Sequence, residues 1–194
     1  MSSRWRARDF DLLDALDALP RIAVDNTVWR VVRQARDPLL CRPSLGRWDL
    51  GHFDVLYTAF DPDGAISEMY FHLSRQPVFP TEPVFTLNEI EVSTRSTLKF
   101  ADLTEFATLG VDPADYSDIL YERTQEIGDA AAFLGFDGLI APSARWDCLN
   151  LAIFCGSLSP GDLVLTASST IDWDDWRERS GGSTKAKRGE RPTE

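Results

Sequence analysis

Short strand-like runs recur along the chain, and helical segments do not alternate with them regularly. The runs are rich in β-branched and aromatic residues, which favour a pleated backbone. They fall at residues 27–32, 55–59, 84–92, 98–103, 138–143, 150–154 and 163–166. Apolar residues at helical spacing predict helices at 8–19, 65–73 and 115–134. Because a doubly wound sheet needs regular βαβ alternation, this order predicts an α+β fold.

The length of 194 residues fits one domain with a sizeable core. We expect an N-terminal helix in residues 1–20, the main domain in 21–179 and a disordered tail in 180–194, where apolar residues almost vanish. No apolar run approaches the roughly 20 residues that span a bilayer. No apolar segment follows the basic N-terminus either, so we expect a cytoplasmic protein.

The charge balance argues against nucleic acid as a direct partner. The chain has 31 acidic and 20 basic residues, for a formal net charge of −11. Proteins that bind nucleic acid use clustered Lys and Arg to neutralise phosphates. The one basic cluster in the sequence lies in the tail, around Lys185, Lys187 and Arg188.

Cysteine and histidine supply little catalytic material. Cys41, Cys148 and Cys155 are odd in number and lack C-x-x-C spacing, so we predict buried, inert thiols rather than a disulfide framework or a metal site. His52 and His72 are the only histidines, and no P-loop, G-x-G-x-x-G, G-x-S-x-G or H-E-x-x-H motif is present. Any enzymatic chemistry therefore has to rest on carboxylates and arginines.

Two candidate residues lie in the first third of the chain. Arg47 follows a glycine in an irregular segment, where its planar fork can bind a diphosphate. The alternative is a surface arginine that packs over Trp48. Tyr57 lies in the predicted strand 55–59 and can offer its ring to a heteroaromatic group; the alternative is a core tyrosine whose hydroxyl is satisfied.

Two further candidates follow. Glu68 lies in a predicted helix with apolar neighbours, on the same face as Ala65 and His72. The alternative is a glutamate on an exposed face. Ser143 follows a buried strand and Pro142; the alternative is an ordinary turn or N-cap serine, which is the usual occupant of such a position.

Taken together and in order, these segments resemble the RES domain family. Gly46-Arg47-Trp48 matches the heart of its Gly-Gly-Arg-Trp-Asn motif, Leu56-Tyr57 its strand end, and Ala65 to Glu68 its Ala-x-x-Glu helix. Pro142-Ser143-Ala144 and Asn150-Leu151 match its late segments, and the resemblance covers roughly residues 27–168. Leu45 departs from the motif's first glycine. Asp49 stands where asparagine is usual, which places a negative charge near the supposed diphosphate.

The resemblance implies a fold, a substrate and partners. The fold would be ADP-ribosyltransferase-like, with a split, curved, mixed β-sheet around an NAD cleft and flanking helices. The protein would be a toxin that consumes NAD as substrate, needs no metal, and pairs with a helical antitoxin of the Xre/ParS type. A homodimer and a protein acceptor are further expectations. The implied catalytic residues are Glu68 and Arg47, and the implied NAD-binding residues are Arg47, Tyr57, Ser143 and Asn150.

The residue types suit cleavage of the nicotinamide–ribose bond. Nicotinamide leaves without a general acid, and the barrier lies in an oxocarbenium-like ribose that a carboxylate such as Glu68 can stabilise. ADP-ribose would then pass to water or phosphate. Two alternatives stay open: transfer of ADP-ribose to a cellular protein, and an inactive module that binds NAD without consuming it.

Overall fold

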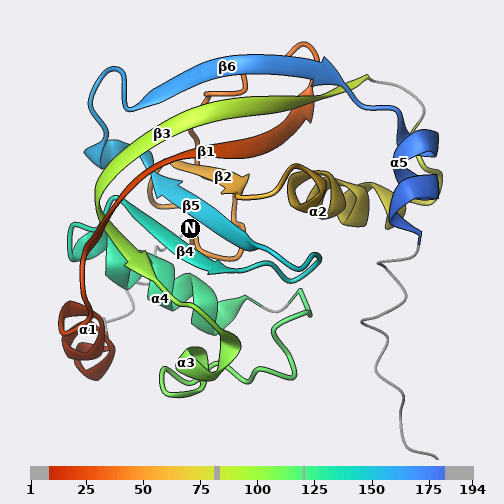
Figure 1. The fold of residues 1–194 in the computed structure, drawn as a ribbon. Coiled ribbons are helices and arrows are strands. Elements are labelled where there is room, and N and C mark those ends of the chain that lie inside the picture. Colours follow the sequence, from red (N-terminus) through yellow and green to blue (C-terminus); the bar gives the residue numbers. More distant parts are fainter. Residues whose placement is uncertain (1–8, 81–83, 120, 182–194) are drawn as a thin grey trace, which may run out of the picture.

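The computed structural model describes residues 9–80, 84–119 and 121–181, and it has the predicted α+β architecture (Figure 1). The helices and strands follow in this order: α1 Phe10–Asp17, β1 Ile22–Arg33, β2 Val55–Ala59, α2 Pro62–Ser74, β3 Phe85–Lys99, α3 Leu103–Ala107, α4 Glu122–Phe133, β4 Gly138–Pro142, β5 Leu149–Phe154, a 3-10 turn Cys155–Ser157, β6 Leu163–Thr170 and α5 Trp173–Ser180.

The sheet is mixed, and its strand pairings form a ring. The strand order is β1-β2-β5-β4-β3-β6, and β1 also pairs with β3. Only β3 and β4 run parallel. Figure 1 shows β1, β3 and β6 curving over the layer of β2, β5 and β4. The ring is weakest between β1 and β2, which share the single pair Trp29 and Ala59.

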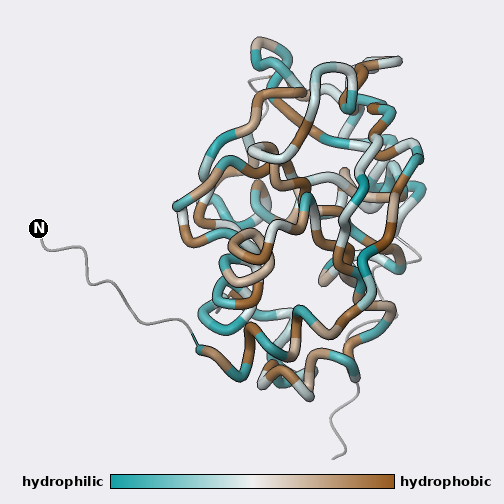
Figure 2. Tube along the Cα trace, turned by 90° about the vertical axis from the view of Figure 1, so that its left-hand side faces the viewer, coloured by the Kyte–Doolittle hydropathy of each residue, from teal (hydrophilic) through white to brown (hydrophobic). Residues whose placement is uncertain are grey.

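Helices cover the two ends of this sheet. α2 and α5 lie together at one end, and α1, α3 and α4 lie below the layer of β4 and β5 (Figure 1). The N-terminal helix packs on its own domain, through Leu12, Leu13 and Leu16. Figure 2 shows apolar and polar residues mixed along the whole trace. No helix within the described residues is long and apolar enough to cross a bilayer.

One predicted strand boundary is wrong. The runs at 84–92 and 98–103 belong to one long strand, β3, which ends at Lys99. The polar stretch between them stays extended because the buried Asp137 carboxylate accepts the N–H groups of Arg95 and Ser96, at 2.6 and 2.7 Å. Residues 101–103 leave the strand because Asp102 caps α3, a helix that the sequence pattern did not predict.

The start of α4 and the start of the C-terminal tail also differ from prediction. α4 begins at Glu122 rather than at residue 115, because 112–118 form turns that bury Tyr116. Near the C-terminus, Ser180 belongs to α5, a helix that was not predicted, rather than to the predicted tail, and its hydroxyl donates to the carbonyl of Trp176. The rest of the predicted tail, 182–194, lies outside the described residues, and the division into domains stays a prediction.

The prediction of three inert thiols is wrong for two of them. Cys41 and Cys155 form a disulfide across 114 positions, with their Cα atoms 6.3 Å apart. Local spacing could not reveal this pair, because it depends on how 41–55 folds back. The backbone of Arg42 bridges to Val55, and the N–H of Cys155 donates to the carbonyl of Asp54 at 2.9 Å. Cys148 keeps its thiol.

Candidate active site

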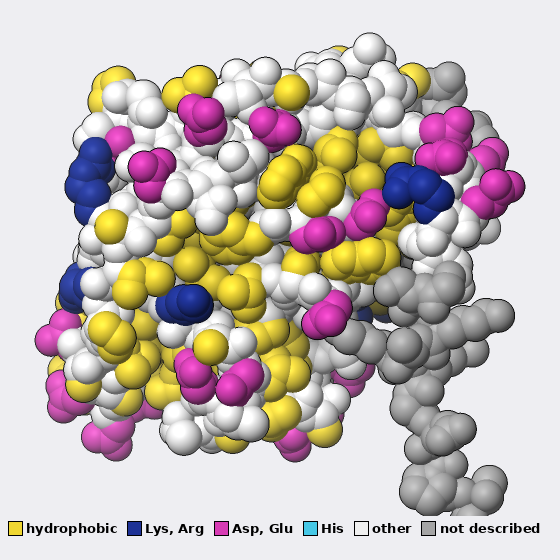
Figure 3. Space-filling view, viewed as in Figure 1, with side chains coloured by type: hydrophobic (Ala, Val, Ile, Leu, Met, Phe, Trp, Pro, Cys, Tyr) yellow, Lys and Arg dark blue, Asp and Glu magenta, His cyan; other side chains and the backbone are white. Residues whose placement is uncertain are grey.

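A cavity of about 410 Å³ opens where β1 and β2 diverge. Its walls include Trp29 and Ala59, the only residue pair that joins these strands, and side chains from α2, β5 and the turns around 44–48 and 116–121. Figure 3, viewed as in Figure 1, shows apolar side chains across the middle of the molecule, with few charged side chains among them. Of the predicted site residues, Arg47, Tyr57, Glu68 and Asn150 line the cavity directly.

Helix α2 presents Glu68 to the cavity. Asp61 caps the helix by accepting the N–H of Gly64 at 2.9 Å, and Pro62 occupies the first turn. The predicted face is real, because Ala65, Glu68 and His72 all line the cavity. The Glu68 side chain is half-buried, so the alternative of a glutamate on an exposed face does not describe it.

Two residues distant in sequence fix the Glu68 carboxylate. Its Oε1 atom accepts the hydroxyl of Ser143 at 2.7 Å and the Nδ2 amide of Asn150 at 3.0 Å. Both bonds go to the same oxygen, and no residue in the described part of the chain donates to Oε2. The carboxylate is therefore oriented, and one oxygen is left for a ligand.

Ser143 serves the turn and the site together. Its hydroxyl accepts the N–H groups of Arg145 at 3.1 Å and Trp146 at 3.3 Å, while it donates to Glu68. Ser143 is buried, and it is absent from the cavity wall itself. Ser143 therefore contacts the Glu68 carboxylate and does not line the cavity.

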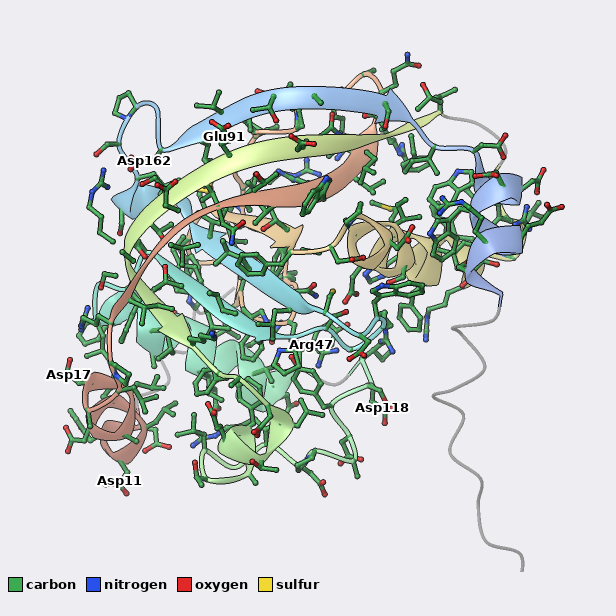
Figure 4. All side chains as sticks on the ribbon, viewed as in Figure 1. Asp11, Asp17, Arg47, Glu91, Asp118 and Asp162 are labelled. Carbon is green, nitrogen blue, oxygen red and sulfur yellow. A yellow bond between two sulfur atoms is a disulfide. The ribbon has the colours of Figure 1, made fainter. Side chains whose placement is uncertain are left out.

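Arg47 reaches the cavity from the irregular segment before β2. Its guanidinium lies 4.4 Å from the ring centre of Tyr116 and 4.6 Å from that of Tyr121, and it donates to the carbonyl of Asp118 at 3.3 Å. Figure 4 shows Arg47 below the layer of β4 and β5, with Asp118 on the same side of that layer. The alternative of stacking on Trp48 is wrong, because that indole is buried against Phe106.

Tyr57 supports this segment with its hydroxyl and lines the cavity with its ring. The hydroxyl accepts the N–H of Trp48 at 2.9 Å, so the alternative of a satisfied hydroxyl holds for that group. Burial raises the pKa of Tyr57 well above its usual value, which keeps the phenol protonated. The Tyr57 ring also explains the motif glycine: a Cβ at Gly46 would lie 2.7 Å from the phenol oxygen.

Asp49 organises the same segment from inside. It is fully buried, and its carboxylate accepts the N–H groups of Ser44 and Leu45, at 2.5 and 3.0 Å, as well as that of Gly51. The carboxylate faces the backbone of its own segment, so it does not repel a diphosphate at Arg47 as the sequence suggested. Leu45, the other departure from the motif, has a φ of 57°, the left-handed region that favours glycine.

Helix α4 packs directly against the backbone of this segment. Gln125 donates from Nε2 to the carbonyl of Gly46 at 2.9 Å. Gly128 faces the carbonyl of Trp48 so closely that a Cβ there would lie 2.0 Å from the oxygen. The helix and the Arg47 segment therefore form one packed unit.

Sequence reasoning missed several residues around the cavity. Tyr116 and Tyr121 hold Arg47, and Arg145 places its guanidinium 3.4 Å from the ring centre of Phe71. Burial lowers the pKa of Arg145, and the nearby Glu68 opposes that shift. Arg145 had a weak signal, since it follows Ser143 in the matched segment. The tyrosines lie in turns that carry no periodic pattern. Within the described ranges, no three His, Cys, Asp or Glu side chains form a group that could hold a metal.

A comparison with family models decides the family. The model of the RES domain matches residues 27–174. The chain belongs to the RES domain family. Arg47, Tyr57, Glu68, Ser143 and Asn150 all lie inside the matched region.

The fold also matches a solved member of a toxin–antitoxin complex. The crystal structure of the M. tuberculosis MbcT–MbcA toxin–antitoxin complex contains a chain that superposes with a TM-score of 0.78 at 22% sequence identity. The match covers 89% of the present chain and 98% of that chain. No curated protein matches the sequence. The structural likeness supports the α+β fold of this RES domain.

Proposed function

We propose that this RES domain is a toxin of a toxin–antitoxin pair that consumes NAD by cleaving its nicotinamide–ribose bond, with water or phosphate as acceptor. The observation that carries the proposal is the oriented Glu68 carboxylate in the wall of a 410 Å³ cavity. Arg47 and aromatic rings line the same space. The RES match supports the substrate class, and the likeness to a chain of the M. tuberculosis toxin–antitoxin complex supports the toxin class.

Glu68 would stabilise the charge that develops as the bond breaks. Nicotinamide departs as a neutral base, and positive charge moves to the ribose, as in glycoside hydrolysis. A carboxylate beside that ribose can accept one of its hydroxyls and stabilise the oxocarbenium-like transition state. Ser143 and Asn150 occupy Oε1 and would act as positioning residues, which leaves Oε2 to meet the substrate.

Arg47 and Tyr57 would bind the rest of the dinucleotide. A guanidinium forms charge-assisted hydrogen bonds with a diphosphate, and the rings of Tyr116 and Tyr121 hold Arg47 in place for this. The Tyr57 ring would lie against nicotinamide. We also propose that the cavity is an NAD cleft like that of ADP-ribosyltransferases. It lies where the mixed sheet opens, at the β1–β2 junction.

The Glu68→Gln variant tests the catalytic assignment. The amide keeps the size of the side chain and removes its charge, so we expect NAD consumption to fall by about 100-fold or more while the fold is retained. NAD depletion by the purified protein is the measurement. Glu91→Gln is the matched control, because Glu91 is exposed on strand β3. Wild-type turnover by Glu68→Gln would remove Glu68 from the mechanism.

The products separate the alternatives. Labelled NAD and cell extract would yield free ADP-ribose products from our mechanism, a labelled protein band from an ADP-ribosyltransferase, and bound but unconsumed NAD from an inactive module. We expect a helical antitoxin of the Xre/ParS type as partner, and a homodimer stays a prediction. A cytoplasmic location is also still a prediction, and disulfides such as Cys41–Cys155 are uncommon in that compartment.

A further inference from the structure

A second pocket, of about 310 Å³, adjoins the active-site cavity. The two share Arg30, Val31, Met69 and His72, so they are continuous along β1 and α2. The second pocket then extends along α2 to Leu73 and on to Gln76, just beyond the end of that helix. At a rise of 1.5 Å per helical residue, its lining on α2 runs from Met69, next to Glu68, to Leu73, roughly 8 Å along the helix axis from Glu68. A group bound there lies beside the reacting centre rather than in it.

The lining of this pocket is basic, in contrast to the chain as a whole. Four arginines and one aspartate face it: Arg30, Arg33, Arg36, Arg42 and Asp37. The chain has a net charge of −11, so such a concentration of positive charge departs sharply from its average. Asp37 is partly engaged by its own loop, where it accepts the N–H of Leu39 at 2.9 Å.

Within the described residues, Asp37 is the one acidic side chain in the lining, and its charge acts on Arg30. Among the residues that the structure describes, none of the four arginines forms an ion pair. Arg30 donates only to the carbonyls of Pro38 and Leu40, at 2.9 and 3.2 Å. Its burial, with the charge of Arg42 nearby, lowers the pKa of Arg30 to about 10. Burying a cation among other cations is costly unless an anion offsets it.

The second pocket fits an anion with several acceptor oxygens. Guanidinium groups present paired N–H donors that match phosphate geometry. Three of the arginines have exposed side chains that can adjust to a ligand, and Arg30 gives the pocket a fixed floor. His72 adds little charge, because burial lowers its pKa.

We propose that this pocket binds a phosphate monoester group, either free inorganic phosphate or the 2′-phosphate of a phosphorylated dinucleotide. The inference rests on the proposed function for the identity of the dinucleotide, and on the arginines alone for the phosphate. Arg47, in the turn at 44–48, remains assigned to the diphosphate.

Calorimetric titration of inorganic phosphate into the full chain tests the pocket, with sodium chloride matching the ionic strength because salt screens such contacts. We expect saturable binding. Arg36→Gln and Arg42→Gln should each weaken it about tenfold, the loss of one charge-assisted contact. Arg177→Gln on α5 is the matched control and should leave the affinity unchanged. Phosphate that does not bind, or that binds Arg36→Gln and Arg42→Gln as it binds wild type, would overturn the proposal.

Dinucleotide titrations identify the source of the phosphate. If the 2′-phosphate occupies the pocket, NADP binds more tightly than NAD and competes with inorganic phosphate, and Arg36→Gln abolishes the preference. If free phosphate is the ligand, NAD and NADP bind alike and phosphate binds equally well in the presence of NAD. Either result requires that the second pocket binds a phosphate group.

The second pocket and the proposed function can fail separately. Phosphate binding without any binding or consumption of dinucleotide would refute the proposed function and keep the pocket. NAD consumption by a protein that does not bind phosphate would refute the pocket alone.

Discussion

Helix α2 and the segment 42–51 both deliver a charged side chain to one cavity, and they are held in place by different means. In α2, the cap at Asp61 and regular backbone bonding fix the helix, and Ser143 and Asn150 then orient Glu68. In 42–51, no helix or strand fixes the backbone. The buried Asp49 carboxylate gathers its N–H groups instead.

The difference shows where each half of the site is vulnerable. On the α2 side, the residues that orient the carboxylate touch it directly. On the Arg47 side, the residues that support the segment contact the backbone next to Arg47. Tyr57 and Gly128 contact the backbone of Trp48, and Gln125 contacts the carbonyl of Gly46. Substitutions that never touch a ligand should therefore damage the arginine side more than the carboxylate side.

The largest expected effect comes from Gly128→Ala. Its Cβ would lie 2.0 Å from the carbonyl oxygen of Trp48, which belongs to backbone that packs against the helix. We expect a loss of about 3 kcal/mol in the free energy of unfolding, as for overpacked cores, measured by urea denaturation. Gly156→Ala is the matched control, because nothing lies within 4 Å of its added Cβ. Equal stability of both variants would mean that α4 and the Arg47 segment are not one packed unit.

Asp49→Ala should have a smaller effect on stability. The change leaves the N–H groups of Ser44, Leu45 and Gly51 without their acceptor, and some of them can turn to water. We expect a loss of about 2 kcal/mol in the free energy of unfolding and weaker NAD binding by calorimetry. Asp61→Ala is the comparison on the α2 side, where loss of a cap should cost about 1 kcal/mol. If Asp61→Ala costs as much as Asp49→Ala, the two sides do not differ as we argue.

The smallest expected effect is a change in the pKa of His72 on the α2 side of the site. Burial lowers the pKa of His72, and the charge of Glu68 opposes that shift. His72 is therefore neutral at pH 7, and it becomes protonated only at a pH below the usual titration of histidine. In Glu68→Gln the opposing charge is gone, so the pKa of His72 should fall further, as measured by an NMR titration. An unchanged pKa of His72 would show that Glu68 does not act on this histidine as we argue.

Much of the site could be predicted from sequence because its motifs are short and local. The helical spacing of Ala65, Glu68 and His72 predicted a shared face, and those three residues do line the cavity. The Gly46-Arg47-Trp48 motif pointed to the right family, which the RES match confirms. The functional roles of these residues stay predictions, as do the roles of Tyr57, Ser143 and Asn150.

The amino-acid order by itself determined the α+β class, most of the helices and strands, and the position of Glu68 on its helix, since each depends on neighbours a few residues away. Only the tertiary structure decided that Ser143 and Asn150, 75 and 82 positions from Glu68, share its Oε1 atom. The Cys41–Cys155 disulfide, the inward role of Asp49 and the arginine-lined pocket also needed it. The physical reason is that strand pairing and chain reversal set these distances, and no local pattern of hydrophobicity or charge encodes them.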